Sequence, residues 1–195
     1  MKHPSNRDLF AYWNKQRGTR LAPERSEIEP GAIRQVLGDT FVLASDGVSN
    51  HPFRLAGTRL CALFSRELKG ESFVQLWERS GQTALRELIA VVSEEKVGIV
   101  ASVSGTTADD AVLPVGLELL LLPLDSPSKA DARILGALAP MTMPYWLGAK
   151  PIGPLKLGMF RHIGTAAEVN AAPRVVAASG RLMHGLTVYD GGLAH

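Results

Sequence analysis

Hydrophobic and polar positions alternate along this chain with two different periods, which separate the expected helices from the expected strands. Apolar residues recur three and four positions apart over 7–17 and again over 82–95, and this spacing predicts two amphipathic helices. Shorter apolar segments, bounded by glycine, proline or polar turn residues, are typical of strands. These segments are 41–44, 53–55, 97–104, 115–122 and 133–138.

The stretch that follows the second expected strand has the pattern of a cluster of short helices. A helix is expected over 58–64, a turn over 65–69, and a second short helix opening at 70–72. One more helical segment is expected from Ser26 to Leu37. The resulting order predicts an α+β fold, in which an antiparallel five-stranded sheet carries the helical cluster on one face.

Three segments are expected along the chain. Residues 1–27 form an N-terminal flanking helix and its connector, and residues 28–140 form the α+β domain. Residues 141–195 are expected to be an irregular C-terminal extension, because repeated prolines interrupt regular structure there. Within it, 175–177 and 186–188 are either short strands or part of a tail that orders only on a partner.

Composition and charge narrow the class of protein. Hydrophobic residues make up 46% of the chain and the net charge is +2, so we expect a folded, soluble protein with no nucleic-acid partner. Cys61 is the single cysteine, which excludes an internal disulfide and fits a reducing compartment. No signal peptide or membrane-spanning run is present, so we expect a cytoplasmic protein without a membrane contact.

A series of short motifs in a fixed order adds a family resemblance. The motifs are Tyr12-Trp13, Arg20 with Pro23 and Arg25, Phe53 to Thr58, Arg66 to Gly70, Glu118 to Leu124, and Leu135 to Ala137. In this order they resemble the bacterial PAS_5 family of PAS-like proteins, over roughly Arg7 to Pro140. The resemblance implies a regulatory or interaction role, and it implies that the chain is not an enzyme, since PAS modules generally carry no reaction of their own.

The PAS resemblance also indicates where a small molecule would bind. In a PAS fold the helical cluster and the facing side of the sheet can enclose a pocket, whereas a densely filled core is the alternative. The side chains expected to line that pocket are apolar or aromatic. They are Phe41, Leu55, Leu60, Phe64, Phe73, Trp77, Leu85, Ile89 and Leu119.

The identity of any cofactor stays open, but two are disfavoured. Light-sensing PAS domains carry a cysteine where this chain has Phe73, which disfavours a covalent flavin. Haem-binding PAS domains commonly take a histidine from the long helix, and the expected helix 82–95 has none, which disfavours His-ligated haem. The five histidines show no ligand spacing, so no metal site is expected.

Two side chains in the expected domain are candidates for polar chemistry. Glu118 shares a strand face with leucines, so it needs a partner, and Arg54 or Arg66 is expected to supply it. The alternative is a carboxylate that binds a ligand in the pocket. Cys61 is expected to be a small buried hydrophobe, with a reactive thiol as the alternative.

The N-terminal helix presents an apolar stripe of Leu9, Phe10 and Trp13. Such a stripe must be buried on something. It packs either on its own domain or across a dimer or partner interface, and the two alternatives are equally open.

These observations favour a stand-alone PAS-like sensor or interaction module that acts through protein–protein contacts, with gating by a small ligand left open. Its expected partners are a second copy in a homodimer, a separate signalling protein and a small-molecule ligand. One alternative is a small enzyme or carrier that uses the same cavity through Cys61, Glu118 and an arginine. Another is weak nucleic-acid binding through a patch of Arg54, Arg59, Arg66 and Lys69.

Overall fold

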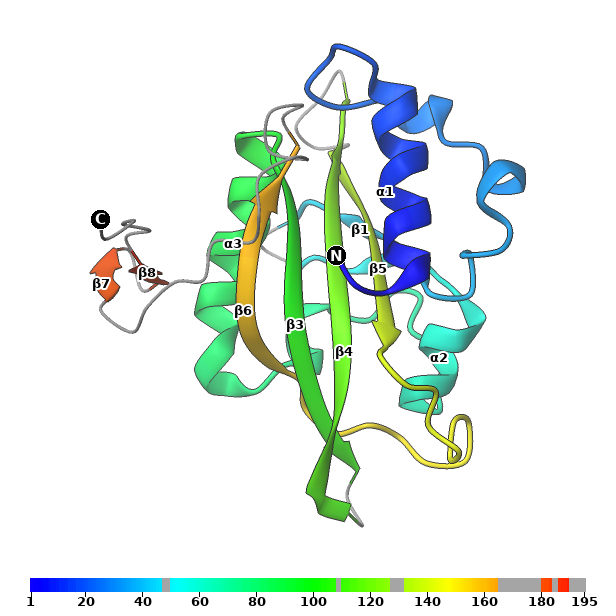
Figure 1. Ribbon diagram of the computed structural model, residues 1–195, viewed down its shortest axis with the longest axis vertical. Helices are drawn as coiled ribbons and strands as arrows, with labels where there is room; N and C mark the ends of the chain where they lie inside the picture. Colours follow the sequence, from blue (N-terminus) through cyan, green and yellow to red (C-terminus); the bar gives the residue numbers. More distant parts are fainter. Residues whose placement is uncertain (47–49, 108–109, 127–131, 165–179, 184–185, 190–195) are drawn as a thin grey trace, which may run out of the picture.

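The computed structural model describes residues 1–46, 50–107, 110–126, 132–164, 180–183 and 186–189. An antiparallel six-stranded sheet has the order β2-β1-β5-β4-β3-β6 (Figure 1). Its strands are β1 Thr40–Ala44, β2 Phe53–Ala56, β3 Gly98–Thr107, β4 Asp110–Leu124, β5 Arg133–Pro140 and β6 Lys156–Ile163. The α+β class and the antiparallel sheet that the sequence predicts are therefore confirmed.

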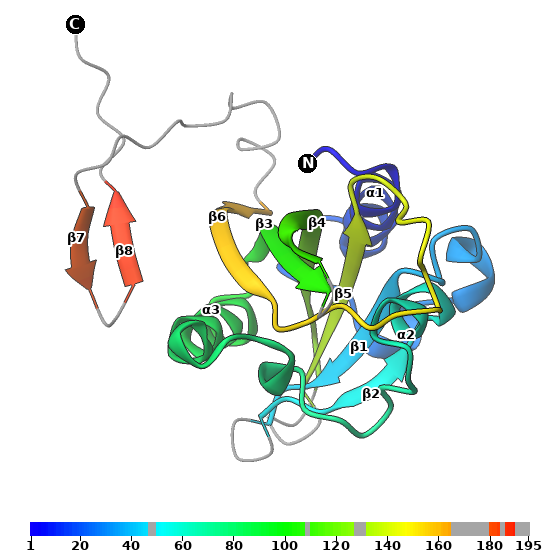
Figure 2. The ribbon, with the colours of Figure 1, turned by 90° about the horizontal axis from the view of Figure 1, so that it is seen from below.

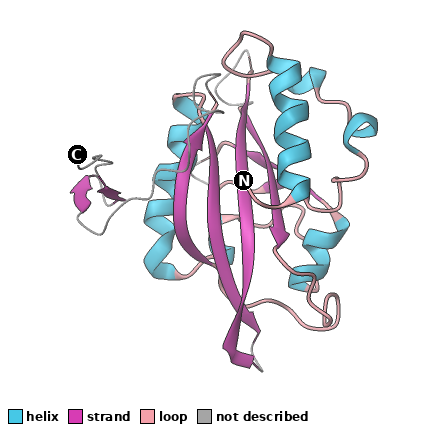
Figure 3. Ribbon diagram, viewed as in Figure 1, coloured by secondary structure: helices cyan, strands magenta, loops and turns pink. Residues whose placement is uncertain are grey.

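Helices cover both faces of the sheet. Figure 2, which looks along the sheet from below, shows helix α1 on one face and helix α3 on the other. The short 3-10 helix η2 contributes to the core on the α1 side, and α2 and η3 contribute to the core on the α3 side. Figure 3 distinguishes the helices from the strands and loops in the view of Figure 1. The bounds of the helices are α1 Pro4–Arg17, η1 Arg25–Glu27, η2 Pro30–Ile33, α2 Thr58–Phe64, η3 Val74–Leu76, η4 Arg79–Gly81 and α3 Gln82–Glu94.

The central strand β4 separates two hydrophobic cores because successive side chains of a strand point to opposite faces. Leu117, Leu119 and Leu121 enter the core under α2 and α3. Leu120 and Leu122 enter the core under α1. The helical cluster thus lies on one face, as predicted, while the flanking helix closes the other.

Helix α1 begins three residues earlier than the sequence predicts. The His3 side chain accepts a hydrogen bond from the Ser5 backbone N–H, and Pro4 occupies the first turn, where its missing N–H costs nothing. Gly18 ends the helix with φ +57°. The predicted helical segment 26–37 is instead the two short helices η1 and η2 and a series of turns.

The sheet has one strand more than the five predicted. The additional strand is β6, which lies in the segment expected to be irregular. β6 pairs antiparallel with β3, from Gly98 opposite Ile163 to Ser104 opposite Lys156. Its position at the sheet edge leaves most of its side chains at least partly exposed, so it lacks the apolar alternation of a half-buried strand. Both strands that follow α3 extend beyond the predicted 97–104 and 115–122, since β3 runs to Thr107 and β4 begins at Asp110.

Farther along the chain, β7 Gly180–Met183 and β8 Leu186–Tyr189 form a separate antiparallel pair. For 186–188, where a short strand and a tail were both left open, the structure has a strand. The other segment, 175–177, lies outside the described residues.

Candidate functional site

A buried carboxylate joins the flanking helix to the helical cluster. Asp39 stands just before β1 and is 2% exposed. Its Oδ2 accepts a hydrogen bond from the Ser5 hydroxyl of α1 at 2.7 Å. Arg59 of α2 donates from Nε to Oδ1 at 2.8 Å and from Nη2 to Oδ2 at 2.7 Å. One carboxylate therefore holds an element from each side of the sheet, in the bidentate geometry that makes arginine–carboxylate pairs strong.

The close approach of α2 to this carboxylate depends on Gly57. A Cβ at Gly57 would collide with the backbone oxygens of Leu37 and Gly38. The glycine also lets its own N–H donate to the Thr40 carbonyl and the Leu60 N–H donate to the Gly38 carbonyl. The Ala-Gly-Thr part of the motif that begins at Phe53 thus places Arg59 within reach of Asp39.

A second buried carboxylate, Glu118, holds the start of α1. Its Oε1 accepts the Lys2 backbone N–H at 2.6 Å, and its Oε2 accepts the His3 N–H at 2.8 Å. The Asn6 amide donates both to Oε2 and to the Glu118 carbonyl. The first turn of α1 contains no acidic residue of its own, so Glu118 supplies the negative charge favoured at a helix N-terminus.

The expected ion pair between Glu118 and Arg54 or Arg66 is therefore wrong. Glu118 faces α1, whereas Arg66 lies on the other side of the molecule and pairs with Glu71 at 2.9 Å. Arg54 on β2 is exposed. The sequence showed that Glu118 needs a partner, but the partners are the Lys2 and His3 backbone N–H groups and the Asn6 amide, which a sequence pattern does not reveal.

The apolar residues expected to line a ligand pocket pack against one another. Phe73 makes ring contacts with Phe41, Phe53 and Trp77, with centroid separations of 5.3 to 5.7 Å. Phe41 also covers Gly136, where a Cβ would collide with its ring. Eight of the nine expected lining residues belong to this core, and the ninth, Leu55, is 40% exposed on β2.

Among the described residues of this core, the Trp77 indole Nε1 is a buried polar atom that donates no hydrogen bond. A pocket of about 270 Å³ lies elsewhere, on the α1 side, between Asp8 and Tyr12 of α1 and the 31–36 segment. Sequence reasoning did not identify this pocket, because its wall is formed by turns rather than by a regular element.

The N-terminal stripe packs mainly within its own chain. Leu9 and Trp13 are fully buried in the core under α1. The Trp13 indole N–H donates to the Pro123 carbonyl of β4 at 2.8 Å, and the Arg17 guanidinium lies over its ring. Phe10 is partly buried beside them. Leu9 and Trp13 are therefore not available to a partner while α1 is in place.

The remaining candidates for chemistry show no activation. Cys61 is partly buried, and burial is the main reason why the pKa of its thiol is raised, whereas a reactive thiolate needs a lowered pKa. Within the described part of the chain, no three His, Cys, Asp or Glu side chains gather in a way that would hold a metal ion. Over the same residues, no helix is long and apolar enough to cross a membrane.

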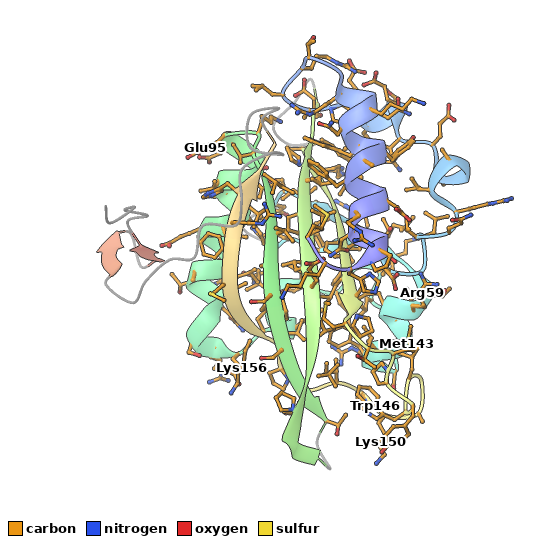
Figure 4. The ribbon with its side chains drawn as sticks, in the orientation of Figure 1. Arg59, Glu95, Met143, Trp146, Lys150 and Lys156 are labelled. Carbon is orange, nitrogen blue, oxygen red and sulfur yellow. The ribbon has the colours of Figure 1, made fainter. Side chains whose placement is uncertain are left out.

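Sequence reasoning missed the connection between β5 and β6, which passes close to α2. The Gly148 N–H donates to the Ala62 carbonyl at 3.1 Å, and the Ile152 N–H donates to the Leu63 carbonyl at 2.7 Å. Figure 4 shows Met143, Trp146 and Lys150 of this connection below Arg59, on the same side of the molecule in this view. The signal that was available is the apolar run Met141 to Trp146 in a proline-rich segment.

An antiparallel sheet with a helical cluster on one face and a flanking N-terminal helix on the other defines a PAS-type domain. The family model described as PAS domain, PAS_5, matches residues 1–139, so the chain belongs to this family. No curated protein matches the chain. Membership in the family makes the chain a sensor or regulatory module, of a kind that is typically not enzymatic.

Proposed function

We propose that this protein is a regulatory module that acts through protein–protein contacts. A change in the position of α2 on one face of the sheet would alter the position of α1 on the other face through Asp39. The observation that carries the proposal is the shared carboxylate, which accepts from Ser5 of α1 and from Arg59 of α2. A displacement of α2 would move Arg59 away from the buried Asp39 carboxylate and leave its charge unpaired. The contact between Asp39 and α1 would then weaken. We also propose that it works in the cytoplasm.

The packed core favours a contact-based role over a permanently bound small molecule. Phe41, Phe73 and Trp77 already fill the space between cluster and sheet. A gating ligand would have to favour one of two conformations, for example one that places an acceptor on the free Trp77 N–H. An enzyme or carrier that depends on Cys61 finds no support, since the pKa of this thiol is raised.

Self-association remains part of the proposal, but through a surface other than the Leu9 and Trp13 stripe. Those side chains are covered by the sheet of their own chain, and releasing them would expose the core under α1. Native mass spectrometry of the purified protein reads stoichiometry and bound small molecules together. A strict monomer that also shows no partner by affinity capture would count against the contact-based role.

Amide hydrogen exchange tests the transmission step. Arg59→Met removes the guanidinium on α2 without touching α1, and we expect faster exchange over residues 4–17. The matched control is Arg66→Met, which removes an exposed ion pair with Glu71 from the same cluster and should leave α1 unchanged. If Arg59→Met changes exchange only around α2, the proposed transmission through Asp39 is wrong.

A further inference from the structure

The pocket on the α1 side of the sheet is lined by one acidic and one basic side chain. Asp8 belongs to α1 and Arg34 to the 31–36 segment, and both line the cavity of about 270 Å³ between these two walls. We propose that this pocket binds a small zwitterion, an amino acid whose ammonium group contacts Asp8 and whose carboxylate contacts Arg34. The proposal rests on the proposed function where it makes this ligand a regulator of α1.

Both charges of the pocket are available to a ligand. In the part of the chain that the structure describes, the Asp8 carboxylate and the Arg34 guanidinium form no hydrogen bond or ion pair, and both residues are exposed. A guanidinium can donate two parallel hydrogen bonds to a carboxylate, and a carboxylate accepts hydrogen bonds from an ammonium group. A zwitterion would therefore find a counter-charge on each wall without breaking an existing pair.

The pocket also has an apolar surface. Ile33 is 6% exposed and Val36 is 4% exposed, and the Tyr12 ring packs against the same core under α1. The Tyr12 hydroxyl is already engaged, because it donates to the Glu27 carbonyl and accepts from the Glu29 N–H. Tyr12 therefore offers its ring rather than its hydroxyl. An apolar lining with a few charged groups suits an amino acid with an aliphatic side chain.

The volume and the charges together restrict the ligand. About 270 Å³ lies below the range of about 300 to 1,000 Å³ that is usual for the sites of drug-sized ligands and cofactors. A flavin, a haem or a nucleotide is therefore too large, whereas a free amino acid fits. A simple anion would be repelled by Asp8 and a simple cation by Arg34, so a molecule with both charges is favoured over either.

The two walls of the pocket lead to the Asp39 junction. Ser5, which donates to Asp39, lies three residues before Asp8 and thus on the same face of α1. In the opposite wall, the Val36 carbonyl accepts from the Asp39 N–H at 3.0 Å. A ligand that bridges Asp8 and Arg34 would therefore hold α1 against the segment that leads into Asp39.

The test is a titration of the full-length protein with L-leucine, followed through the backbone amide signals by heteronuclear NMR. We expect saturable shifts over residues 8–12 and 31–36, with a dissociation constant of about 1 mM or below, as for a small ligand in a half-open site. γ-Aminobutyrate, whose two charges lie farther apart, distinguishes an ω-amino acid from an α-amino acid. Glycine should bind more weakly than L-leucine, because it lacks the apolar side chain.

Removal of either charge, from the ligand or from the protein, should weaken binding. Isovalerate lacks the ammonium group and isoamylamine lacks the carboxylate, and each should bind about tenfold more weakly than L-leucine. Asp8→Asn and Arg34→Gln should each raise the dissociation constant of L-leucine about tenfold, and their exposed positions should leave the fold intact. The matched control is Arg7→Gln, which removes an exposed cation beside Asp8 but outside the pocket lining and should leave binding unchanged.

Three results would overturn the proposal. The first is that neither L-leucine, γ-aminobutyrate nor any other common amino acid shifts the amides of the pocket in a saturable way. The second is that isovalerate or isoamylamine binds as tightly as the amino acid. The third is that Arg7→Gln weakens binding as much as Arg34→Gln does.

Failure of the pocket is distinguishable from failure of the proposed function. If L-leucine binds but Arg59→Met leaves exchange in α1 unchanged, the pocket stays and the transmission through Asp39 is wrong. If no amino acid binds while Arg59→Met speeds up exchange in α1, the transmission stays and the pocket is wrong. When both hold, saturating L-leucine should slow exchange over residues 4–17, and exchange that stays the same would remove the regulatory role of the ligand.

Discussion

Arg59 holds Asp39 through two nitrogen atoms, from Nε to Oδ1 at 2.8 Å and from Nη2 to Oδ2 at 2.7 Å. The Asp39 side chain is 4% exposed and that of Arg59 is 38% exposed, so the pair reaches from the interior to the surface. Because Oδ2 also accepts the Ser5 hydroxyl, the pair is one half of a link between α2 and α1. We propose this link as the route by which the two helical layers of a PAS domain with a filled core influence each other.

Ser5 and Arg59 should be energetically coupled although no bond joins them. Each single variant, Ser5→Ala and Arg59→Met, should lower the free energy of unfolding by about 1.5 to 3 kcal/mol, the range for a hydrogen bond to a charged group. The double variant should deviate from additivity by about 0.5 to 1 kcal/mol, because both residues act on one carboxylate. Urea unfolding of the four proteins measures the cycle, and strict additivity would contradict the shared link.

Glu118→Gln should destabilise the start of α1. The amide keeps the shape but loses the charge that accepts the Lys2 and His3 N–H groups, which should cost about 2 kcal/mol. Exchange in the first turn of α1 should rise. The control Glu95→Gln changes an exposed carboxylate at the end of α3 and should stay within about 0.5 kcal/mol of the wild type. Equal stability of both variants would show that Glu118 does not anchor the helix.

Gly57→Ala should disturb the junction without changing any charged residue. The added methyl would meet the backbone oxygens of Leu37 and Gly38, which move only with β1 and η2, so a loss of about 2 kcal/mol is expected. Nothing lies within 4 Å of a Cβ at Gly31, so Gly31→Ala is the neutral control. Thermal unfolding compares the two variants, and equal melting temperatures would argue against close approach at Gly57.

His51 should make the fold sensitive to acid. Burial lowers the pKa of its imidazole below the ordinary value of 6.5, despite the hydrogen bond to the Ala44 backbone and the charge of Asp46. The unfolded chain therefore binds a proton at a pH where the folded chain does not. The contribution of the neutral His51 to the free energy of unfolding is therefore present above pH 6.5 and is lost as the pH falls below this value.

His51→Asn tests this pH dependence, since asparagine tolerates the positive φ of 55° at this position and does not titrate. The decline of the free energy of unfolding from neutral pH towards pH 5 should be shallower than in the wild type. His162→Asn removes an exposed histidine on β6 and should leave the decline as it is. Parallel pH profiles for His51→Asn and the wild type would exclude the buried imidazole as the cause.

Several structural roles of the motif residues emerge only from the fold. Gly136 is needed because the Phe41 ring lies over it. Glu118 and Pro123, which belong to one motif, accept hydrogen bonds from His3 at the start of α1 and from Trp13 of α1. Asp39 interrupts the helical pattern in the sequence, and nothing in its neighbourhood shows that Ser5 and Arg59 converge on it. The partners are 34 and 20 residues away, beyond the reach of any local pattern.

The sequence by itself determined the α+β class, the helical cluster, the alternation of β4 and the family, because periodicity and ordered motifs are local properties of a chain. It also showed that Leu9, Trp13 and Glu118 must be buried or paired. Only the tertiary structure decided what buries and pairs them, that the aromatic side chains fill the expected pocket, and that β6 completes the sheet. Those outcomes depend on contacts between distant segments, and the geometry of a contact follows from packing, which no spacing along the chain encodes.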